Sequence, residues 1–250
     1  MTATFHIGCA GWSIPKQFSD AFPRDGSHLQ RYSARLNAVE INSSFYRSHQ
    51  RKTYARWAQT VPADFRFSVK LPRAITHDAR LIDCGKPLDA FFDEIGALER
   101  KLGCVLIQLP PSLDFDRNVV RRFLKTLRHR FAGACAVEPR HATWFDGTAN
   151  ELLAEFSVER VAADPAVVPA AAYPGGEGKL VYFRLHGSPK IYYSNYEQKY
   201  LRKLARQLRA AANTAADVWC IFDNTAVGHA TGNALTIDAL LHDKCRKAAY

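Results

Sequence analysis

Short apolar runs rich in β-branched residues alternate with longer helical segments along almost the whole sequence. We expect strands at residues 5–10, 38–42, 66–71, 104–109, 134–138, 158–163, 180–186 and 218–222. Between them we expect a helix that begins near Ser27 and helices at 51–59, 87–101, 118–130, 148–156, 195–212 and 233–243. The interval after the sixth strand has no convincing helix, because Pro165, Pro169, Pro174 and two adjacent glycines interrupt it.

This regular alternation indicates a parallel sheet covered by its crossover helices. With eight expected strands, we predict an α/β fold in the form of a closed (β/α)8 barrel of the TIM-barrel type, for which about 250 residues is typical. The chain has 250 residues and no Gly/Ser-rich or Pro-rich linker, so we expect one barrel domain over residues 1–250. An open doubly wound sheet is the alternative, but the Gly11-Trp12 turn lacks the G-x-G-x-x-G spacing typical of it.

The second expected strand has polar residues where a buried barrel strand would have apolar ones. Val39 and Ile41 alternate with Glu40 and Asn42, and period-two alternation puts the two polar side chains on one face. In a parallel barrel that face is the interior, where an unpaired carboxylate costs several kcal/mol or shifts its pKa strongly. Glu40 therefore has either a fixed partner or a ligand.

Polar residues also stand at the C-terminal ends of the other expected strands, where TIM-barrel active sites lie. The full set is Glu40, Asn42, Lys70, Gln108, Glu138, Arg140, Asp164, Arg184, His186, Asp223 and Asn224. We take Glu40, Glu138 and His186 as the candidate catalytic residues, because carboxylates and imidazoles exchange protons with substrates. An internal ion-pair network that fixes strand register is the alternative interpretation of the same charges.

The remaining candidates are expected to bind the substrate. They are Trp12, Asn42, Tyr46, Lys70, His77, Gln108, Arg140, Trp144, Arg184 and Asn224. The basic residues among them are suited to an anionic group. The aromatic residues on the same loops would form a stacking wall for a sugar or base, whereas packing in the core is the alternative for each ring alone.

The net charge of +10 and a pI near 9.4 make an anionic partner plausible, either phosphorylated small molecules or nucleic acid. Many of the basic residues lie at helical spacing in 121–128 and 199–209, which favours solvated helix faces over a surface that binds phosphates. We expect a cytoplasmic protein without a membrane partner, since no apolar run has transmembrane length and no signal sequence opens the chain. The six cysteines fit buried thiols in a reducing compartment.

A divalent metal is a further alternative, and the sequence names no other cofactor. Glu40, Glu138, Asp164 and His186 have the right ligand types for such a site. There is no H-E-x-x-H motif or metal-binding cysteine spacing, and Lys70 and Arg184 would already neutralise the two glutamates. We therefore assign no metal ligands.

Several motifs in order resemble the YecE-like family, which is described as a domain of unknown function. The matching stretches are GCAGW at 8–12, VEINSSFY at 39–46, FSVKLP at 67–72, QLPP at 108–111, VEPRH at 137–141, RLHG at 184–187 and FDNT at 222–225. The resemblance implies a TIM-barrel-like fold and no established reaction. Such proteins are compared by fold with the endonuclease-four and xylose-isomerase barrels, which use metals on phosphodiesters or sugars. This sequence does not show the His-rich ligand set expected of a trinuclear zinc nuclease. Asp223 stands where the family usually has asparagine.

The leading hypothesis is an enzyme that acts on a small phosphorylated or carboxylated substrate at the C-terminal barrel face by acid–base chemistry. One alternative is a nucleic-acid-binding or nuclease-like protein, which would use the basic surface and the loop aromatics. The other is a barrel that binds a ligand without catalysis. The reaction and the oligomeric state are left open.

Overall fold

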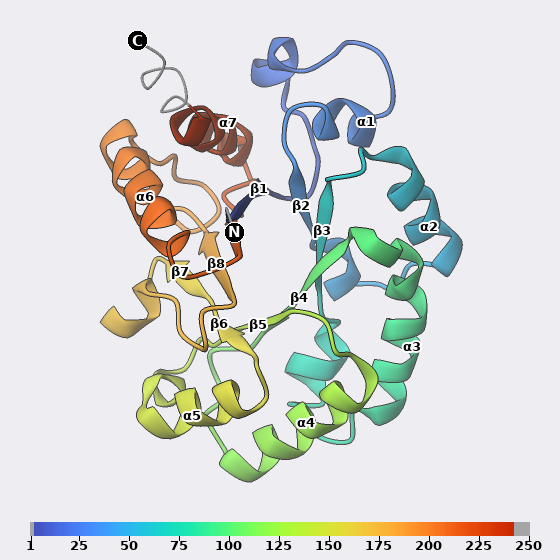
Figure 1. Ribbon diagram of the computed structural model, residues 1–250, viewed down its shortest axis with the longest axis vertical. Helices are drawn as coiled ribbons and strands as arrows, with labels where there is room; N and C mark the ends of the chain where they lie inside the picture. The colour runs from blue at the N-terminus through green and yellow to red at the C-terminus, as the bar shows by residue number, and fades with distance from the viewer. Residues whose placement is uncertain (1–2, 243–250) are drawn as a thin grey trace.

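The computed structural model describes residues 3–242 and contains an all-parallel sheet wrapped into a barrel, with helices around it (Figure 1). The strands are β1 Thr4–Ala10, β2 Ala38–Ile41, β3 Arg66–Lys70, β4 Leu102–Gln108, β5 Cys135–Glu138, β6 Glu159–Arg160, β7 Ala162–Asp164, β8 Leu180–Leu185 and β9 Asp217–Phe222. They are ordered β6-β5-β4-β3-β2-β1-β9-β8-β7. The predicted α/β barrel of the TIM-barrel type is confirmed.

The barrel closes through a broken strand. The predicted sixth strand forms both β6 and β7, which are separated only by Val161. The first part pairs with β5 and the second with β8, and the Val161 amide donates to the Val137 carbonyl at 2.9 Å. The break lets one stretch of chain pair with both β5 and β8. The nine short strands therefore occupy the eight strand positions of a TIM barrel.

The helices that cover the sheet agree with the predicted alternation. They are α1 His28–Ser33, α2 Arg51–Thr60, α3 Gly85–Ile95, α4 Arg117–Arg130, α5 Gly147–Glu155, α6 Gln198–Ala211 and α7 His229–His242. Polar caps fix several of their starts: Ser27 forms a capping box with Gln30, while Asp116 and Asp146 accept from the first amides of α4 and α5. After β7 there is only the short turn η6 Pro169–Ala172, as the prolines predict.

Two predicted helix boundaries are wrong. The expected helix at 87–101 changes at Gly96 into the 3-10 segment η4 Gly96–Lys101, in which Glu99 has φ of 50°. The last helix begins at His229 rather than at residue 233, and its Asn233 side chain bonds to neighbouring loops. Its expected end at residue 243 lies outside the described residues. No described helix is both long and apolar enough to span a membrane.

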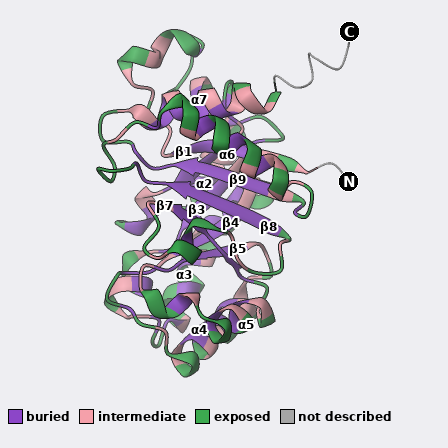
Figure 2. Cartoon of the chain, turned by 90° about the vertical axis from the view of Figure 1, so that its left-hand side faces the viewer, coloured by how far each residue is buried: buried purple, intermediate pink, exposed green. Residues whose placement is uncertain are grey.

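Apolar side chains form two layers on opposite faces of the sheet. The larger cluster lies between the strands and the helices, and Figure 2 shows the strands buried between these covering elements. The smaller cluster lies inside the barrel, where the rings of Tyr182 and Trp219 stack at 5.8 Å. Cys104 and Cys220 are among the five described cysteines, all of them free and buried. The sixth, Cys245, lies outside the described residues.

On several strands, the inward positions change from apolar to charged toward the C-terminal end. Ala136 is followed two residues later by Glu138, and Ile221 by Asp223. On β8 the inward series runs from Tyr182 to Arg184. The interior therefore has an apolar lower part and a charged upper layer at the end where TIM-barrel sites are built.

Candidate functional site

Arg184 lies at the centre of the charged layer and is fully buried. Its Nη2 and Nε donate to the two carboxylate oxygens of Glu40 at 2.7 and 2.9 Å. Its Nη1 lies 3.1 Å from Glu138, and Nη2 lies 3.0 Å from Asp223. Burial opposes the charged guanidinium, but these three carboxylates outweigh it and raise the Arg184 pKa well above its ordinary value.

Glu40 has a fixed partner, which is one of the two alternatives that its position in the sequence left open. Besides the two bonds from Arg184, its carboxylate accepts from the Tyr182 hydroxyl at 3.0 Å, and this hydroxyl also lies 3.1 Å from Ser68 Oγ. All four residues are fully buried. Glu40 is therefore held in place inside the barrel, which agrees with the ion-pair-network interpretation for this part of the site.

His186 follows β8 and lies between two carboxylates. Its Nε2 is 2.7 Å from Glu138 Oε1, and its Nδ1 is 3.0 Å from Asp223 Oδ2. Arg140 Nη2 lies 2.8 Å from both Glu138 Oε1 and His186 Nε2. A protonated ring donates to both carboxylates, whereas a neutral ring donates to Asp223 and accepts from Arg140. His186 thus has suitable hydrogen-bond partners in both protonation states.

The two carboxylates beside His186 are held in their charged forms. Burial by itself would raise the pKa of Glu138, but the charges of His186, Arg184 and Arg140 keep it well below its usual range. The Asp223 pKa is likewise lowered, because Arg184 and a hydrogen bond from His186 outweigh the effect of burial. Glu138 is sealed in the barrel, while about 6% of the Asp223 side chain is exposed.

Lys70 ends β3 and lies in the same layer, but without a counter-ion. The residue is 5% exposed, and its Nζ lies 4.0 Å above the centre of the Phe45 ring. Within residues 3–242, no carboxylate lies within salt-bridge distance of this ammonium and no hydrogen-bond acceptor contacts it. Burial, followed by repulsion from Arg184, lowers the Lys70 pKa to about 8.

Three buried polar atoms at this end of the barrel have no partner within residues 3–242: Asn42 Oδ1, Arg140 Nε and Asn224 Oδ1. Asn224 is otherwise structural, since its Nδ2 donates to Ser194 and Asn233. Asn42 follows the end of β2 with helical backbone angles, so period-two alternation does not apply to it. Buried polar groups are usually paired, so unpaired ones at a barrel mouth are candidate ligand contacts.

The other predicted substrate-binding residues divide into two groups. Gln108 is half-buried at the end of β4, next to Glu138 in the register, and His77 lies against Phe45 at 4.9 Å between ring centres. Burial and the charges of Arg73 and Lys70 lower the His77 pKa. These two residues lie near the charged layer.

The predicted aromatic wall does not form as one surface. Tyr46 is 74% exposed, and Trp12 packs against Trp57 of α2. Trp144 is 1% exposed, and its indole N–H donates to the Leu113 carbonyl at 2.9 Å. Trp144 thus belongs to the core, which was the alternative for each ring. Tyr192, whose ring lies 6.0 Å from that of His186, covers the imidazole instead.

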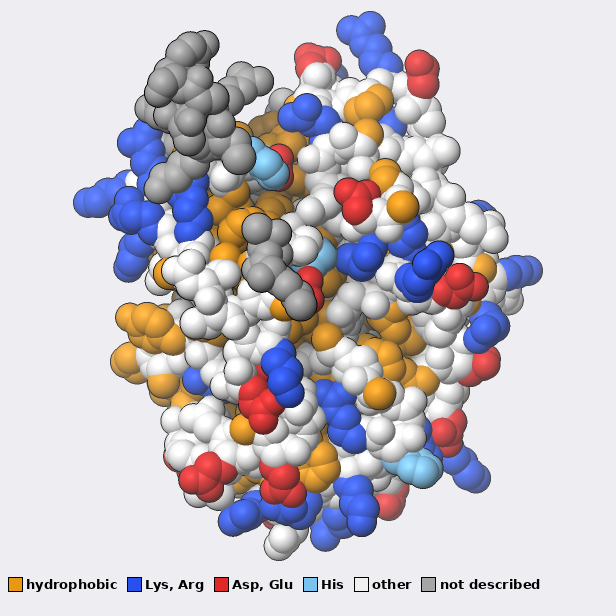
Figure 3. Space-filling view, viewed as in Figure 1, with side chains coloured by type: hydrophobic (Ala, Val, Ile, Leu, Met, Phe, Trp, Pro, Cys, Tyr) orange, Lys and Arg blue, Asp and Glu red, His pale blue; other side chains and the backbone are white. Residues whose placement is uncertain are grey.

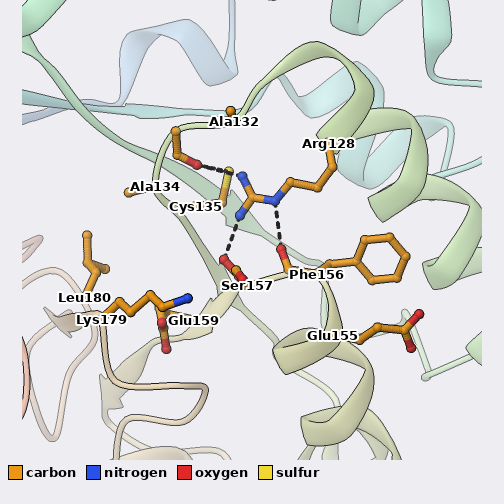
Figure 4. Close-up of a pocket in the computed structure, with 11 residues that line it drawn as sticks. Arg128, Ala132, Ala134, Cys135, Glu155, Phe156, Ser157, Glu159, Lys179 and Leu180 are labelled. Carbon is orange, nitrogen blue, oxygen red and sulfur yellow. Dashed lines mark hydrogen bonds between the residues drawn. The ribbon is translucent and has the colours of Figure 1, made fainter.

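A cavity of about 640 Å³ lies at the opposite end of the barrel, near the start of β5 and β6 (Figure 4). The Arg128 guanidinium there donates to the carbonyls of Phe156, Gly133 and Ser157 at 2.6–2.8 Å. Glu159 accepts from the Gly178 amide at 3.2 Å. Because these charges hold loops together, the cavity lacks the unpaired polar groups found at the C-terminal end.

No group of three or more His, Cys, Asp or Glu in residues 3–242 is arranged to hold a metal ion. The four ligands considered from the sequence do not converge. Asp164 accepts from the Tyr196 hydroxyl at 2.7 Å, and Arg184 lies among the carboxylates of Glu40, Glu138 and Asp223.

With this geometry in place, comparison with known proteins identifies the family. A model described as "Protein of unknown function DUF72" matches residues 6–249. The chain belongs to the DUF72 family. This result confirms the YecE-like resemblance, because the chain is similar to UPF0759 protein YecE of Escherichia coli K12, with 31% identity over 66% of this chain and 61% of that protein. It is also similar to UPF0759 protein YunF of Bacillus subtilis, with 26% identity over 94% of both chains.

Solved structures of DUF72 proteins have the same fold. A family member from Thermotoga maritima matches with a TM-score of 0.80 and 25% identity, covering 95% of this chain and 99% of that one. One from Enterococcus faecalis matches with a TM-score of 0.81 and 22% identity, covering 95% of both.

Sequence reasoning missed several participants in this DUF72 site. Asp223 was collected as a strand-end residue but received no catalytic or binding role, although it bonds both Arg184 and His186. Tyr182 and Ser68 were predicted only as parts of strands. Period-two spacing from Arg184 would have placed Tyr182 in the interior. Phe45 lies within a motif, but its contact with Lys70 depends on the turn after β2.

Proposed function

We propose that this barrel is an enzyme that binds a small phosphorylated or carboxylated substrate at its C-terminal end and exchanges protons with it. The observation that carries this proposal is Lys70, a nearly buried ammonium without a counter-ion in the described residues. Arg140 Nε and Asn42 Oδ1 add an unpaired donor and acceptor nearby. An anion with a neighbouring hydroxyl group would satisfy all three.

The charges of the layer support this assignment. Three cations face three carboxylates: Lys70, Arg140 and Arg184 against Glu40, Glu138 and Asp223. The layer is therefore neutral when His186 is neutral. A protonated His186 ring has carboxylate acceptors for both of its N–H groups. Asp223 is the more exposed of the two acceptors and would pass the proton between His186 and the substrate.

The candidate catalytic set changes in this proposal. His186, Glu138 and Asp223 form the proton-exchanging group, and Lys70 and Arg140 bind the anion. Glu40 and Arg184 position the others, because their charged atoms are occupied and sealed from solvent.

The direct test is calorimetric titration with glycolate and with inorganic phosphate at pH 6 and pH 7.5. We expect binding of at least one of the two anions, and about tenfold weaker binding in Lys70→Met. Lys101→Met is the matched control, because its Nζ already donates to the Val61 carbonyl at the other end of β4. Equal affinity in wild type and Lys70→Met, or no binding of either anion, would refute the anion site. A screen of phosphorylated and carboxylated metabolites for turnover follows, with Asp223→Asn expected to abolish it.

A second candidate function, nucleic-acid binding, is favoured by one surface. Four basic residues of α6 are exposed and have no carboxylate partner within residues 3–242: Lys199, Arg202, Lys203 and Arg206. Figure 3 shows this blue cluster at the upper left, over α6. On α4, by contrast, Arg121 and Arg130 are paired with Glu155 and Asp89.

The α6 surface predicts salt-dependent binding of a labelled single-stranded oligonucleotide. Arg202→Glu/Arg206→Glu should remove this binding, and Arg117→Glu/Lys125→Glu on α4 should reduce it less. No retention of the oligonucleotide at low salt would reject this function.

A further inference from the structure

Lys70 has an environment unlike that of a simple anion anchor. Its backbone is fixed, because Ser44 Oγ donates to the Lys70 carbonyl at 2.7 Å and to that of Ile41 at 2.8 Å. Its Nζ lies 4.0 Å above the centre of the Phe45 ring, and the residue as a whole is only 5% exposed. A positioned amine that is poorly hydrated and free of a counter-ion is the arrangement that makes lysine a nucleophile toward carbonyl groups.

Charged groups from five elements surround this amine. They are Glu40 of β2, His77 of η3 Ala74–Asp78, Glu138 of β5, Arg184 of β8 and Asp223 after β9. Burial and Arg184 together outweigh the three carboxylates and bring the Lys70 pKa down to about 8. At pH 7 a lysine with this pKa has a roughly 300-fold larger fraction of free amine than one with a pKa of 10.5.

The neighbouring strands place an anion-binding group within reach of the same ligand. Only β4 separates β3, which ends in Lys70, from β5, which leads to Arg140, so the two backbones are about 10 Å apart. Both side chains belong to the charged layer, and Arg140 has the unpaired Nε. A ligand with a carboxylate next to a carbonyl carbon fits between a guanidinium and an amine.

We infer that Lys70 is a catalytic nucleophile that forms a Schiff base with a small 2-oxo acid whose carboxylate is bound by Arg140. This inference rests on the anion site proposed above and names its substrate class. The Nζ lone pair forms a C–N bond with the carbonyl carbon. The two amine protons and the carbonyl oxygen leave as one water molecule, so no oxidation occurs. The nearly closed surroundings of Lys70 limit hydrolysis of the resulting imine.

The test is reductive trapping with glyoxylate and sodium cyanoborohydride at pH 7, read by intact mass and peptide mapping. We expect one adduct, located at Lys70. Lys70→Arg keeps a positive charge but removes the nucleophile and should lower trapping at least about tenfold, to the background of surface lysines. Lys101→Arg should trap as wild type does. An adduct of equal yield in Lys70→Arg, or none at Lys70 in wild type, overturns the inference.

Two further reagents separate this inference from the proposed anion site and require no variant. Formaldehyde is a carbonyl without a carboxylate, and glycolate is a carboxylate without a carbonyl. If glycolate protects Lys70 from formaldehyde but glyoxylate gives no adduct, the anion site stands and the Schiff base is rejected. If Lys70 reacts with both carbonyls and glycolate gives no protection, the nucleophile stands and the anion site is rejected.

Discussion

The two halves of the charged layer differ in how completely their polar atoms are used. Around Arg184, every charged group has partners at 2.7–3.1 Å, and Arg184, Glu40 and Glu138 are sealed from solvent. Around Lys70, the ammonium has no counter-ion within residues 3–242, and Asn42 Oδ1 and Arg140 Nε have no partner there. Position at the mouth alone therefore does not single out a candidate ligand contact, and unused hydrogen-bonding atoms narrow the choice.

The difference also separates stability from function. Removing one member of a buried ion-pair network leaves uncompensated charge, so the Arg184 half should govern folding. Removing a group that already lacks a partner changes the free energy of unfolding little or even stabilises the fold. The residues around Lys70 should therefore govern binding.

The largest expected effect is in the half of the charged layer around Arg184, which we call the saturated half because all of its charged groups are paired. Arg184→Met leaves three carboxylates without their shared cation and should lower the free energy of unfolding by about 3–5 kcal/mol. Urea denaturation at pH 7 measures the change. The control is Arg121→Met, whose solvent-exposed pair with Glu155 should contribute little to stability. A loss for Arg184→Met no greater than that of the control would contradict the comparison.

The next effect has the opposite sign. The Lys70 amine has a pKa of about 8 when folded and 10.5 as an unperturbed group, so the unfolded chain holds its proton more tightly. This opposes folding by on the order of 3 kcal/mol below pH 8 and disappears as pH rises toward 10.5. Lys70→Met should therefore be more stable than wild type at pH 7, with a smaller difference at pH 10. A less stable variant at pH 7 would place Lys70 in the saturated half.

Acid should lower the stability of the saturated half by protonating Glu138. Its pKa in the folded protein lies well below the ordinary 4.5, so its contribution is present above that pH and is lost as pH falls below it. Glu138→Gln should lower the free energy of unfolding by about 2 kcal/mol at pH 7 and show a shallower decline between about pH 5 and pH 3. Glu151→Gln, on the exposed side of α5, should keep the decline of wild type. Parallel curves for Glu138→Gln and wild type would count against the prediction.

The smallest effect on stability should come from Asn42. Asn42→Ala removes an unpaired oxygen and should change the free energy of unfolding by no more than about 0.5 kcal/mol, while weakening glycolate binding about tenfold. Asn224→Ala loses bonds to Ser194 and Asn233 and should cost about 1–2 kcal/mol. Chemical denaturation and calorimetry compare the two variants. Unchanged glycolate binding in Asn42→Ala would show that Asn42 does not contribute to the anion site around Lys70.

The barrel and the gathering of strand-end charges were predictable from the sequence, because both follow from strand–helix alternation and inward periodicity. The same periodicity put Glu40, Glu138 and Arg184 in one layer. It could not say which charges pair, since pairing depends on side-chain reach across strands that are distant in the chain, such as Glu40 on β2 and Arg184 on β8.

Loop residues were the least predictable. Trp144 and Asn224 were expected at the site for their chemistry, but the Trp144 indole N–H and the Asn224 amide nitrogen bond to backbone or neighbouring side chains. Local sequence does not reveal such partners, because Leu113 and Ser194 come from other parts of the chain. Asn42 left the strand pattern when the backbone turned into η2 Ser43–Phe45.

The broken strand gives the charged layer a second consequence. Where β6 and β7 meet, β5 has two paired residues with β6, and β8 has three with β7. Glu138 of β5 reaches past this break to Arg184 and His186 on the β8 side. The ion pairs therefore link β5 and β8 across the break, where the strands have few paired residues. In hydrogen exchange, amides of residues 159–164 should open first, and the ion pairs of the charged layer should set how often the barrel opens there.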